Sequence, residues 1–420
     1  MKKSKILLTG MALSLLGCVN SSGINENMDI VESKLERNTN PQSSIAEQKA
    51  LATNNNEFSF EMFNELQKKE KDNIFFSPYS ISTALVMTYA GAEGNTKTQM
   101  SKALHFKDEA KLHNSFNALD LHVNYVDDNY TLSVANSLWP AKGFTFKEEY
   151  LDTIKENYGA KLRVLDYANE TEKSRQTING WIEDKTHDRI KDIIPKGALS
   201  SRTRLTLVNA IYFKAMWENK FSSYMTKSDT FTKEDGSTVE KEFMNQTESF
   251  PYKEHDDFQA INLSYVGNRT SMLVILPKVG KYDKVMENLN SYYNLINSDN
   301  AYERIKLKFP KFEFATKGYQ LKDLFQKLGM VDAFSKHANF KGITEDERLT
   351  IDKIIHKAFI KVDENGSEAA AATVVGMRVT SINPFQEKKP IKMSVNRPFI
   401  FLIRDILSNQ ILFIGLIKEP

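Results

Sequence analysis

The chain has 420 residues, of which 41% are hydrophobic and 26% are charged, so it can bury a large core in one big domain or two ordinary ones. The formal net charge is only +2, which gives no support to a nucleic-acid or other polyanion partner. A single cysteine excludes an intramolecular disulfide.

The first residues predict an export signal. A basic stretch at residues 1–5 precedes an apolar run at 6–16 that is too short to span a bilayer. We expect residues 1–17 to be removed as a lipoprotein signal peptide, which changes the net charge from +2 to −1 because they contain three lysines and no acid. Leu15-Leu16-Gly17-Cys18 is similar to a bacterial lipobox, so Cys18 is the expected lipidation site. The alternative is an ordinary signal peptide with an incidental cysteine.

This signal predicts an exported protein that is lipid-anchored to the membrane through Cys18 in the bacterial cell envelope. The outer membrane is the expected location, with the protein facing either the periplasm or the outside. Residues 18–56 are polar and lack a sustained apolar period, which predicts a flexible tether. A single folded domain is expected at residues 57–420.

The expected elements of this domain follow from apolar spacing, and Ser77 followed by Pro78 marks one helix start. Helices cluster early and strands late, which predicts an α+β domain with large mixed sheets. The expected helices are 58–66, 78–89, 146–158 and 172–189, and the expected strands are 74–76, 130–139, 204–213, 272–276, 304–309, 358–362, 399–404 and 410–417.

Sequence motifs of enzymes are missing. The chain has no GxSxG, HExxH, P-loop, GxGxxG or CxxC motif, and none of its seven histidines pairs with another at metal-ligand spacing. We therefore expect no catalytic residue, no metal and no cofactor, and a protein that is not an enzyme. A Ser-His-Asp triad assembled only in space would make a surface hydrolase the third alternative.

The segment 363–375 (DENGSEAAAATVV) has two conformations open to it. Propensity favours a helix capped by Ser367, whereas the strand-like residues on both sides favour an extended chain. As a strand it places small, uncharged side chains on one face and its charge, Glu368, on the other. Such a segment could be exposed in one state and buried within a sheet in another.

Several motifs in one order resemble the serpin family over residues 57–420. The C-terminal sequences RPFIFLIR (397–404) and ILFIG (411–415) complete the set. The other matching stretches are NIFFSPYSIS (73–82), ANSLW (135–139), LVNAIYFKAMW (207–217), FPKF (309–312) and DENGSEAAAAT (363–373).

The resemblance implies a serpin fold with about three β-sheets, eight to nine helices and an exposed reactive-centre loop at about residues 364–396. It also implies suicide inhibition of serine endopeptidases, and possible inhibition of papain-like cysteine endopeptidases. In this mechanism the protease cleaves the loop and forms an acyl-enzyme. The cleaved loop then inserts into the main sheet and traps the protease. Inserting side chains must be small or apolar, and no proline or charge lies on the inserting face here.

The family pattern assigns roles to individual residues of this chain. Trp217 corresponds to the breach, where insertion begins. The hinge residues are Glu364, Gly366, Ser367, Glu368, Ala369, Ala370, Ala371, Ala372 and Thr373, and the shutter residues are Ser77, Ser80, Asn209 and His356.

The reactive bond has two candidate positions. The family spacing of seventeen residues from Glu364 places it at Thr380-Ser381, which suits elastase- or subtilisin-like proteases. The alternative is Arg378-Val379, which suits a trypsin-like protease because such an enzyme prefers a cation. Residues 383–390 lengthen the loop after the bond and leave the register open.

Target endopeptidases are therefore the expected partners, and we expect a monomer. The runner-up function is a non-inhibitory serpin-fold protein that acts as a binding or chaperone module.

Overall fold

The computed structural model describes residues 28–107, 109–125, 129–298, 301–346, 348–367 and 389–420. Within these ranges it has the expected α+β fold, with nine α-helices and two large sheets. The helices are α1 (Ile45–Gln67), α2 (Pro78–Tyr89), α3 (Gly94–Ala103), α4 (Glu109–Val123), α5 (Glu148–Tyr158), α6 (Thr171–Lys185), α7 (Tyr282–Glu287), α8 (Leu289–Ser298) and α9 (Lys322–Lys327).

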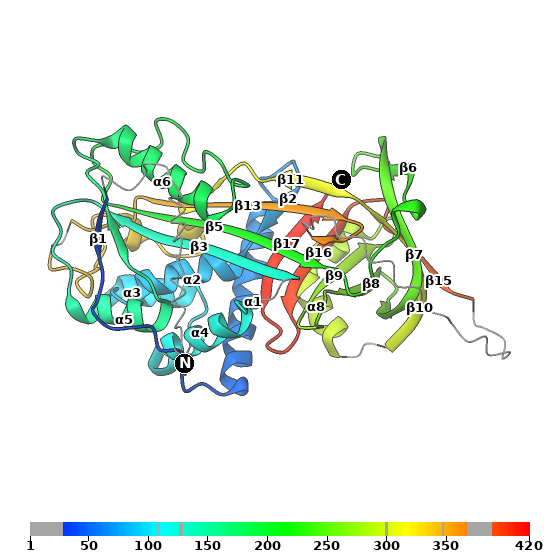
Figure 1. Cartoon of the computed structure of the whole chain (residues 1–420), viewed down its shortest axis with the longest axis horizontal. Helices are drawn as coiled ribbons and strands as arrows, with labels where there is room; N and C mark the ends of the chain where they lie inside the picture. Colours follow the sequence, from blue (N-terminus) through cyan, green and yellow to red (C-terminus); the bar gives the residue numbers. More distant parts are fainter. Residues whose placement is uncertain (1–27, 108, 126–128, 299–300, 347, 368–388) are drawn as a thin grey trace, which may run out of the picture.

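The first sheet runs along the long axis of the molecule (Figure 1). Two of its long strands, β5 and β13, pair directly and in parallel, from Thr206 opposite Lys353 to Ile211 opposite Ala358. In spatial order the strands are β1 (Asp29–Val31), β4 (Leu162–Val164), β3 (Tyr130–Pro140), β5 (Leu205–Met216), β14 (Gly366–Ser367), β13 (Lys353–Asp363) and β11 (Phe312–Ala315), and β12 (Tyr319–Gln320) also pairs with β13.

Alternation along β5 sends side chains into two separate cores. Val208 and Ala210 pack in a small cluster with residues of α6, whereas Leu207 and Ile211 belong to the main core. Successive side chains of a strand point to opposite faces, so both faces of this sheet are covered and its strands are almost continuously apolar. Asn209 therefore faces the main core, which also contains α2.

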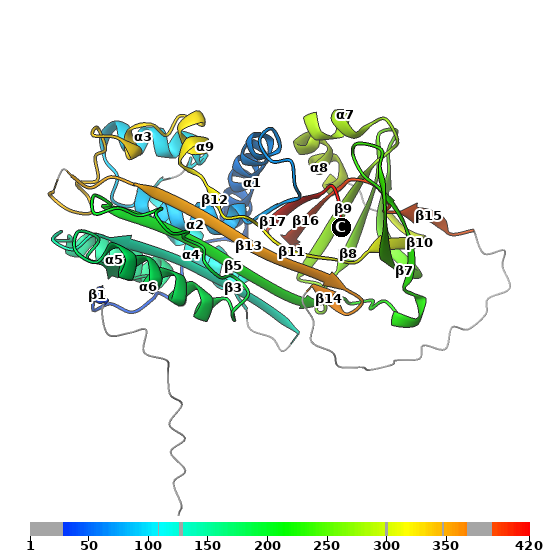
Figure 2. The same ribbon diagram turned by 90° about the horizontal axis from the view of Figure 1, so that it is seen from above.

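The second sheet lies at one end of the molecule (Figure 2). We expected about three sheets, but the 17-residue β7 pairs with β6, β10 and β8 and so joins two parts into one continuous sheet among the described residues. Its strands are β15 (Ile391–Ser394), β10 (Ala301–Pro310), β7 (Thr238–Glu254), β8 (Phe258–Ser264), β9 (Thr270–Pro277), β16 (Phe399–Asp405), β17 (Ile411–Ile417) and β2 (Ile74–Phe76), with β6 (Lys227–Thr232) on β7.

The tether predicted at residues 18–56 is wrong for its described part. The strand β1 pairs with β4, and α1 begins at Ile45, where Ser44 and Glu47 form a reciprocal capping box. The apolar pattern predicted residues 58–66 of this helix but missed its first half, because Asn55 and Asn56 are buried through hydrogen bonds. The Asn56 Nδ2 atom donates to the carbonyl oxygen of Asn409 over 2.8 Å. Specific partners stabilise these amides where the pattern requires apolar side chains.

Part of the exposed loop predicted at residues 364–396 is instead β-strand, near its start and near its end. Gly366–Ser367 forms β14 inside the first sheet, and Ile391–Ser394 forms β15, which pairs in parallel with β10. Ser367 is therefore a strand residue and not a helix cap. The rest of the expected loop, residues 368–388, lies outside the described residues.

Candidate functional site at the top of the first sheet

The strand β14 lies between β5 and β13 and pairs with both of them in antiparallel register. Gly366 is opposite Met216 and Asp363, and Ser367 is opposite Ala215 and Val362. Glycine is required at position 366, because a Cβ atom there would lie only 2.7 Å from the Met216 Cα atom. The expected hinge thus begins as a strand already inserted between the two neighbours.

Ser367 is fully buried and hydrogen-bonded. Its hydroxyl oxygen lies 2.7 Å from the phenol oxygen of Tyr265. The Tyr265 ring stacks on Trp217 with the ring centroids 4.6 Å apart. A polar hydroxyl is tolerated here because it has a partner.

Trp217, the predicted breach residue, is fixed to the chain that leads into β14. Its indole Nε1 atom donates to the carbonyl oxygen of Asp363 over 3.0 Å. Its backbone N–H donates to the carbonyl oxygen of Asn365 over 2.9 Å. The indole is buried. The end of β5 therefore positions the start of the hinge by backbone contacts as well as by packing.

Glu364 is held beside β14 by two side chains. The Thr226 hydroxyl donates to a carboxylate oxygen over 2.7 Å, and the Lys311 Nζ atom lies 3.3 Å from the same oxygen. Partial burial opposes ionisation, but the Thr226 hydrogen bond and the Lys311 charge outweigh it, so the pKa of Glu364 lies below its ordinary value. The carboxylate is thus an ionised anchor at the point where the expected loop begins.

The four predicted shutter residues meet between α2 and the strands β5 and β13. The backbone N–H of Ser77 donates to the Nε2 atom of His356 over 3.1 Å, and the Ser77 hydroxyl donates to the carbonyl oxygen of Leu412 over 2.6 Å. The Nδ1 atom of His356 bonds to the Asn209 side chain, whose amide nitrogen bonds in turn to the Ser80 hydroxyl. All four side chains are fully buried, so the network fastens β5 and β13 to α2.

His356 is neutral in this network. Complete burial lowers the pKa of His356 to about 3, because the protonated ring would lose its hydration. The Nε2 atom accepts from the Ser77 backbone, so the ring proton is on Nδ1 and points to Asn209. The neutral ring therefore serves as donor and acceptor at once.

Two further residues of the site were not predicted. Asn136 lies opposite Asn209 in the β3–β5 pairing, and its Oδ1 atom accepts from the Ser80 hydroxyl over 2.9 Å and from Asn209. It lies within the ANSLW motif, so its position in that motif was the available signal. Tyr265 carried no sequence signal, because its contact with Ser367 crosses 102 positions of the chain.

Other predicted site residues fall outside the described residues. These are the lipidation site Cys18, the hinge positions Glu368, Ala369, Ala370, Ala371, Ala372 and Thr373, and both candidate reactive bonds, Thr380-Ser381 and Arg378-Val379.

The described residues contain a serine, an aspartate and a histidine in contact, but in an order that does not suit a triad. Asp405 accepts from the Ser408 hydroxyl over 2.5 Å and lies 3.1 Å from the Nε2 atom of His122. The carboxylate separates the other two, so the imidazole does not face the hydroxyl as a general base must. The described residues also include no cluster of metal-binding side chains and no helix that is long and apolar enough to cross a bilayer.

The comparisons with known proteins agree with this geometry. Residues 53–420 match the family model described as serpin (serine protease inhibitor). The chain is 40% identical to an uncharacterized serpin-like protein of Thermococcus kodakarensis, over 87% of this chain and 84% of the relative. It is 36% identical to human Serpin B3, over 88% of this chain and all of the relative.

A solved structure has the same fold over nearly the whole chain. The native state of the thermophilic serpin tengpin covers 94% of this chain and 100% of its own, with a TM-score of 0.78 and 26% identity. The chain belongs to the serpin family, whose members are in general inhibitors of proteases and not enzymes.

Proposed function

We propose that this serpin is a suicide inhibitor of serine endopeptidases, with papain-like cysteine endopeptidases as a second target class. The observation that carries the proposal is the position of Ser367, buried between β5 and β13 at the start of the expected hinge. A strand that has begun to insert can continue in the same register if its two neighbours separate.

The register defines what continued insertion would require. Extending β14 by antiparallel pairing would bring Thr373 opposite both Asn209 and His356, which now pair with each other. The direct β5–β13 pairing must therefore open as far as the shutter. A small hydroxyl at residue 373 suits this position, because it can hydrogen-bond to the polar groups that insertion separates.

The reactive bond is proposed at Thr380-Ser381, with Arg378-Val379 as the alternative. The first would suit elastase- or subtilisin-like enzymes and the second a trypsin-like enzyme. Incubation with elastase, subtilisin and trypsin followed by a denaturing gel tests inhibition directly. We expect a covalent complex that survives boiling, and mass spectrometry of the released C-terminal peptide would identify the bond.

Clean cleavage without such a complex for all three proteases would contradict this proposal and favour the non-inhibitory binding or chaperone function. Trypsin inactivated at its catalytic serine is the matched control, because it can bind the loop but cannot form an acyl-enzyme.

We further propose that the protein is lipid-anchored through Cys18 in the cell envelope, with its folded domain facing either the periplasm or the outside. Only residues 19–28 separate that cysteine from β1, which limits the spacer to about 35 Å when fully extended. Cys18→Ser should move the protein from the membrane fraction to the soluble fraction and abolish labelling by radioactive palmitate. Unchanged labelling would contradict lipidation at this cysteine.

A further inference from the structure

A pocket of about 410 Å³ lies at the edge of the first sheet, away from the hinge. The strands β3 and β4 pair only where Leu138 is opposite Leu162, and the pocket occupies the opening beyond this pair, beside α4, α5 and α6. Figures 1 and 2 both show α5 and α6 near β1, at the same end of the first sheet. Its volume is in the range of small-molecule sites.

The charged lining of this pocket is mostly positive. Arg37, Lys161, Arg163 and Lys185 line it together with a single carboxylate, that of Asp120. Asp120 is already engaged, because it pairs with Arg37 over 2.7 Å and accepts from Tyr79 and Asn124, each over 2.6 Å. Two of the remaining cations pair with acids outside the lining: Lys161 lies 4.0 Å from Glu32, and Lys185 lies 3.3 Å from Asp184. Glu32 also acts on Arg163 electrostatically, but Arg163 has no ion pair of its own among the described residues.

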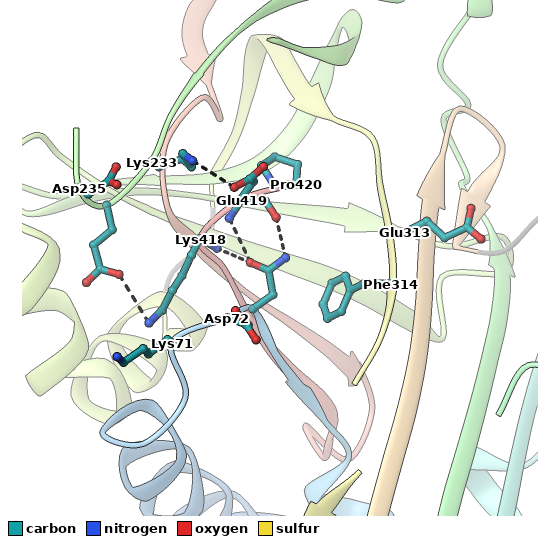
Figure 3. Close-up of a pocket in the computed structure, with 11 residues that line it drawn as sticks. Lys71, Asp72, Lys233, Asp235, Glu313, Phe314, Lys418, Glu419 and Pro420 are labelled. Carbon is teal, nitrogen blue, oxygen red and sulfur yellow. Dashed lines mark hydrogen bonds and ion pairs between the residues drawn. The ribbon is translucent and has the colours of Figure 1, made fainter. Parts of the chain in front are cut away.

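A second cavity differs from this pocket in the charge of its lining. It measures about 490 Å³, surrounds the C-terminal residues, and has two of its lysines in ion pairs (Figure 3). The Nζ atom of Lys233 lies 3.4 Å from Glu419, and that of Lys418 lies 3.5 Å from Glu234. The acids of this lining outnumber its lysines, so the cavity does not attract an anion.

Arg163 is the central cation of the pocket between β3 and β4. Its guanidinium carbon lies 4.3 Å from the ring centroid of Trp181 and 5.7 Å from that of Trp139, so the two indoles fix the orientation of the group. Its Nε atom is buried without a hydrogen-bond partner, and no described carboxylate forms an ion pair with it. Burial lowers the pKa of Arg163 to about 10, which still leaves the group charged at neutral pH.

Asn136 provides a second unsatisfied donor on the same lining. Its Oδ1 atom is occupied by Ser80 and Asn209, whereas its Nδ2 atom is buried without a partner. Buried donors without acceptors are costly, and an acceptor on a ligand would remove that cost. The apolar part of the lining includes Met87, Leu132, Val134, Ala160 and Trp181.

We propose that this pocket binds an amphipathic organic anion, with the anionic group paired with Arg163 and the apolar part against Leu132, Val134 and Trp181. A planar guanidinium matches a carboxylate, sulfonate or phosphate ester through charge-assisted hydrogen bonds. The same ligand can accept from Asn136, which places it in contact with the shutter network.

Isothermal titration of the full-length protein tests this proposal with four probes that share one ring system. These are 2-naphthoate, 2-naphthalenesulfonate, 2-naphthyl phosphate and the cation 2-naphthylmethylammonium. We expect at least one anion to bind with 1:1 stoichiometry and the cation to bind at least tenfold more weakly. The tightest of the three anions identifies the acid class, and its affinity should fall as salt concentration rises.

Arg163→Gln should weaken anion binding at least tenfold, whereas Arg202→Gln, which removes the same charge from an exposed arginine, should leave it unchanged. Lys185→Glu reverses a charge on an exposed lysine at the pocket and serves if the first variant does not fold. It should weaken binding severalfold. Equal binding of the cation, or unchanged anion binding in both Arg163→Gln and Lys185→Glu, would overturn the proposal.

Discussion

At the scale of single residues, the site depends on polar side chains that are buried with specific partners. Ser367 has Tyr265, Glu364 has Thr226 and Lys311, and each shutter side chain has another shutter side chain or a backbone group. Such contacts make each position sensitive to a change of charge or size, because a buried group that loses its partner is destabilising.

Ser367→Arg should convert the inhibitor into a substrate. Ser367 is fully buried between β5 and β13, and a guanidinium there would have to lose its hydration. We expect cleavage of the loop to continue while the boil-resistant complex falls at least tenfold on a denaturing gel. Ser367→Thr, which keeps the hydroxyl and adds one methyl group, is the matched control and should retain most of the complex. If Ser367→Arg inhibited as well as the parent protein, the insertion mechanism would fail.

Burial of His356 in the shutter should make the folded protein less stable at acidic pH. The pKa of His356 is lowered to about 3 in the folded protein, so below pH 6.5 the unfolded chain takes up a proton that the folded chain excludes. The free energy of unfolding should therefore decrease as pH falls from 6.5 to 3, by at most about 1.4 kcal/mol per pH unit from this group.

Denaturant unfolding between pH 7.5 and pH 4 measures this dependence. His356→Gln should reduce the slope of stability against pH, even if the variant is less stable throughout. His337→Gln changes an exposed histidine and should leave the slope unchanged. A slope identical in His356→Gln and the parent would show that this ring does not control the acid response.

At the scale of elements, the first turn of α1 depends on its cap. Ser44 accepts from the backbone N–H of Glu47, and the Glu47 carboxylate accepts from the backbone N–H of Ser44 over 2.7 Å. The Glu47 carboxylate also pairs with Lys111 over 2.6 Å, and these contacts lower the pKa of Glu47 to about 2. The cap therefore fixes a helix start that apolar spacing does not mark.

Ser44→Ala should cost about 1 kcal/mol of local stability in this turn. Amide hydrogen exchange in residues 45–50 should then become roughly fivefold faster, which is the rate factor that corresponds to this free energy. Lys49→Ala lies on the exposed side of the same helix and should not accelerate exchange. Unchanged exchange in Ser44→Ala would mean that the cap does not stabilise the turn.

At the scale of the whole molecule, the first sheet is open to one more long strand. β14 contributes only two residues between β5 and β13, and below it these neighbours pair directly in parallel. Complete insertion would give both neighbours an antiparallel partner along their length. We therefore expect the native fold to be metastable with respect to the inserted form.

Cleavage of the loop within residues 368–388 should raise the melting temperature markedly, because the freed strand can insert and add ladder hydrogen bonds and buried area. Scanning calorimetry before and after limited proteolysis measures the shift. Ser367→Arg is the control, since its cleaved loop should not insert and its melting temperature should rise much less. An unchanged melting temperature in the cleaved parent would argue for a fold that is not metastable.

Features that depend on local pattern could be predicted from the amino-acid sequence. Apolar spacing and turn residues identified α2 and β3 to within a residue of their ends, and the ordered motifs identified the family. For the start of the hinge the sequence left helix and strand open, and the structure shows a strand at Gly366–Ser367.

Contacts between residues far apart in the chain could not be predicted in this way. Buried amides in the first half of α1 resemble a polar tether until Asn409 and Gln410 are placed beside them. Tyr265 and the open pocket around Arg163 have no local signature, because each arises from elements that meet through packing. From sequence alone a polar side chain is predicted to be exposed. Whether it can be buried depends on a hydrogen-bond partner that only the folded chain supplies.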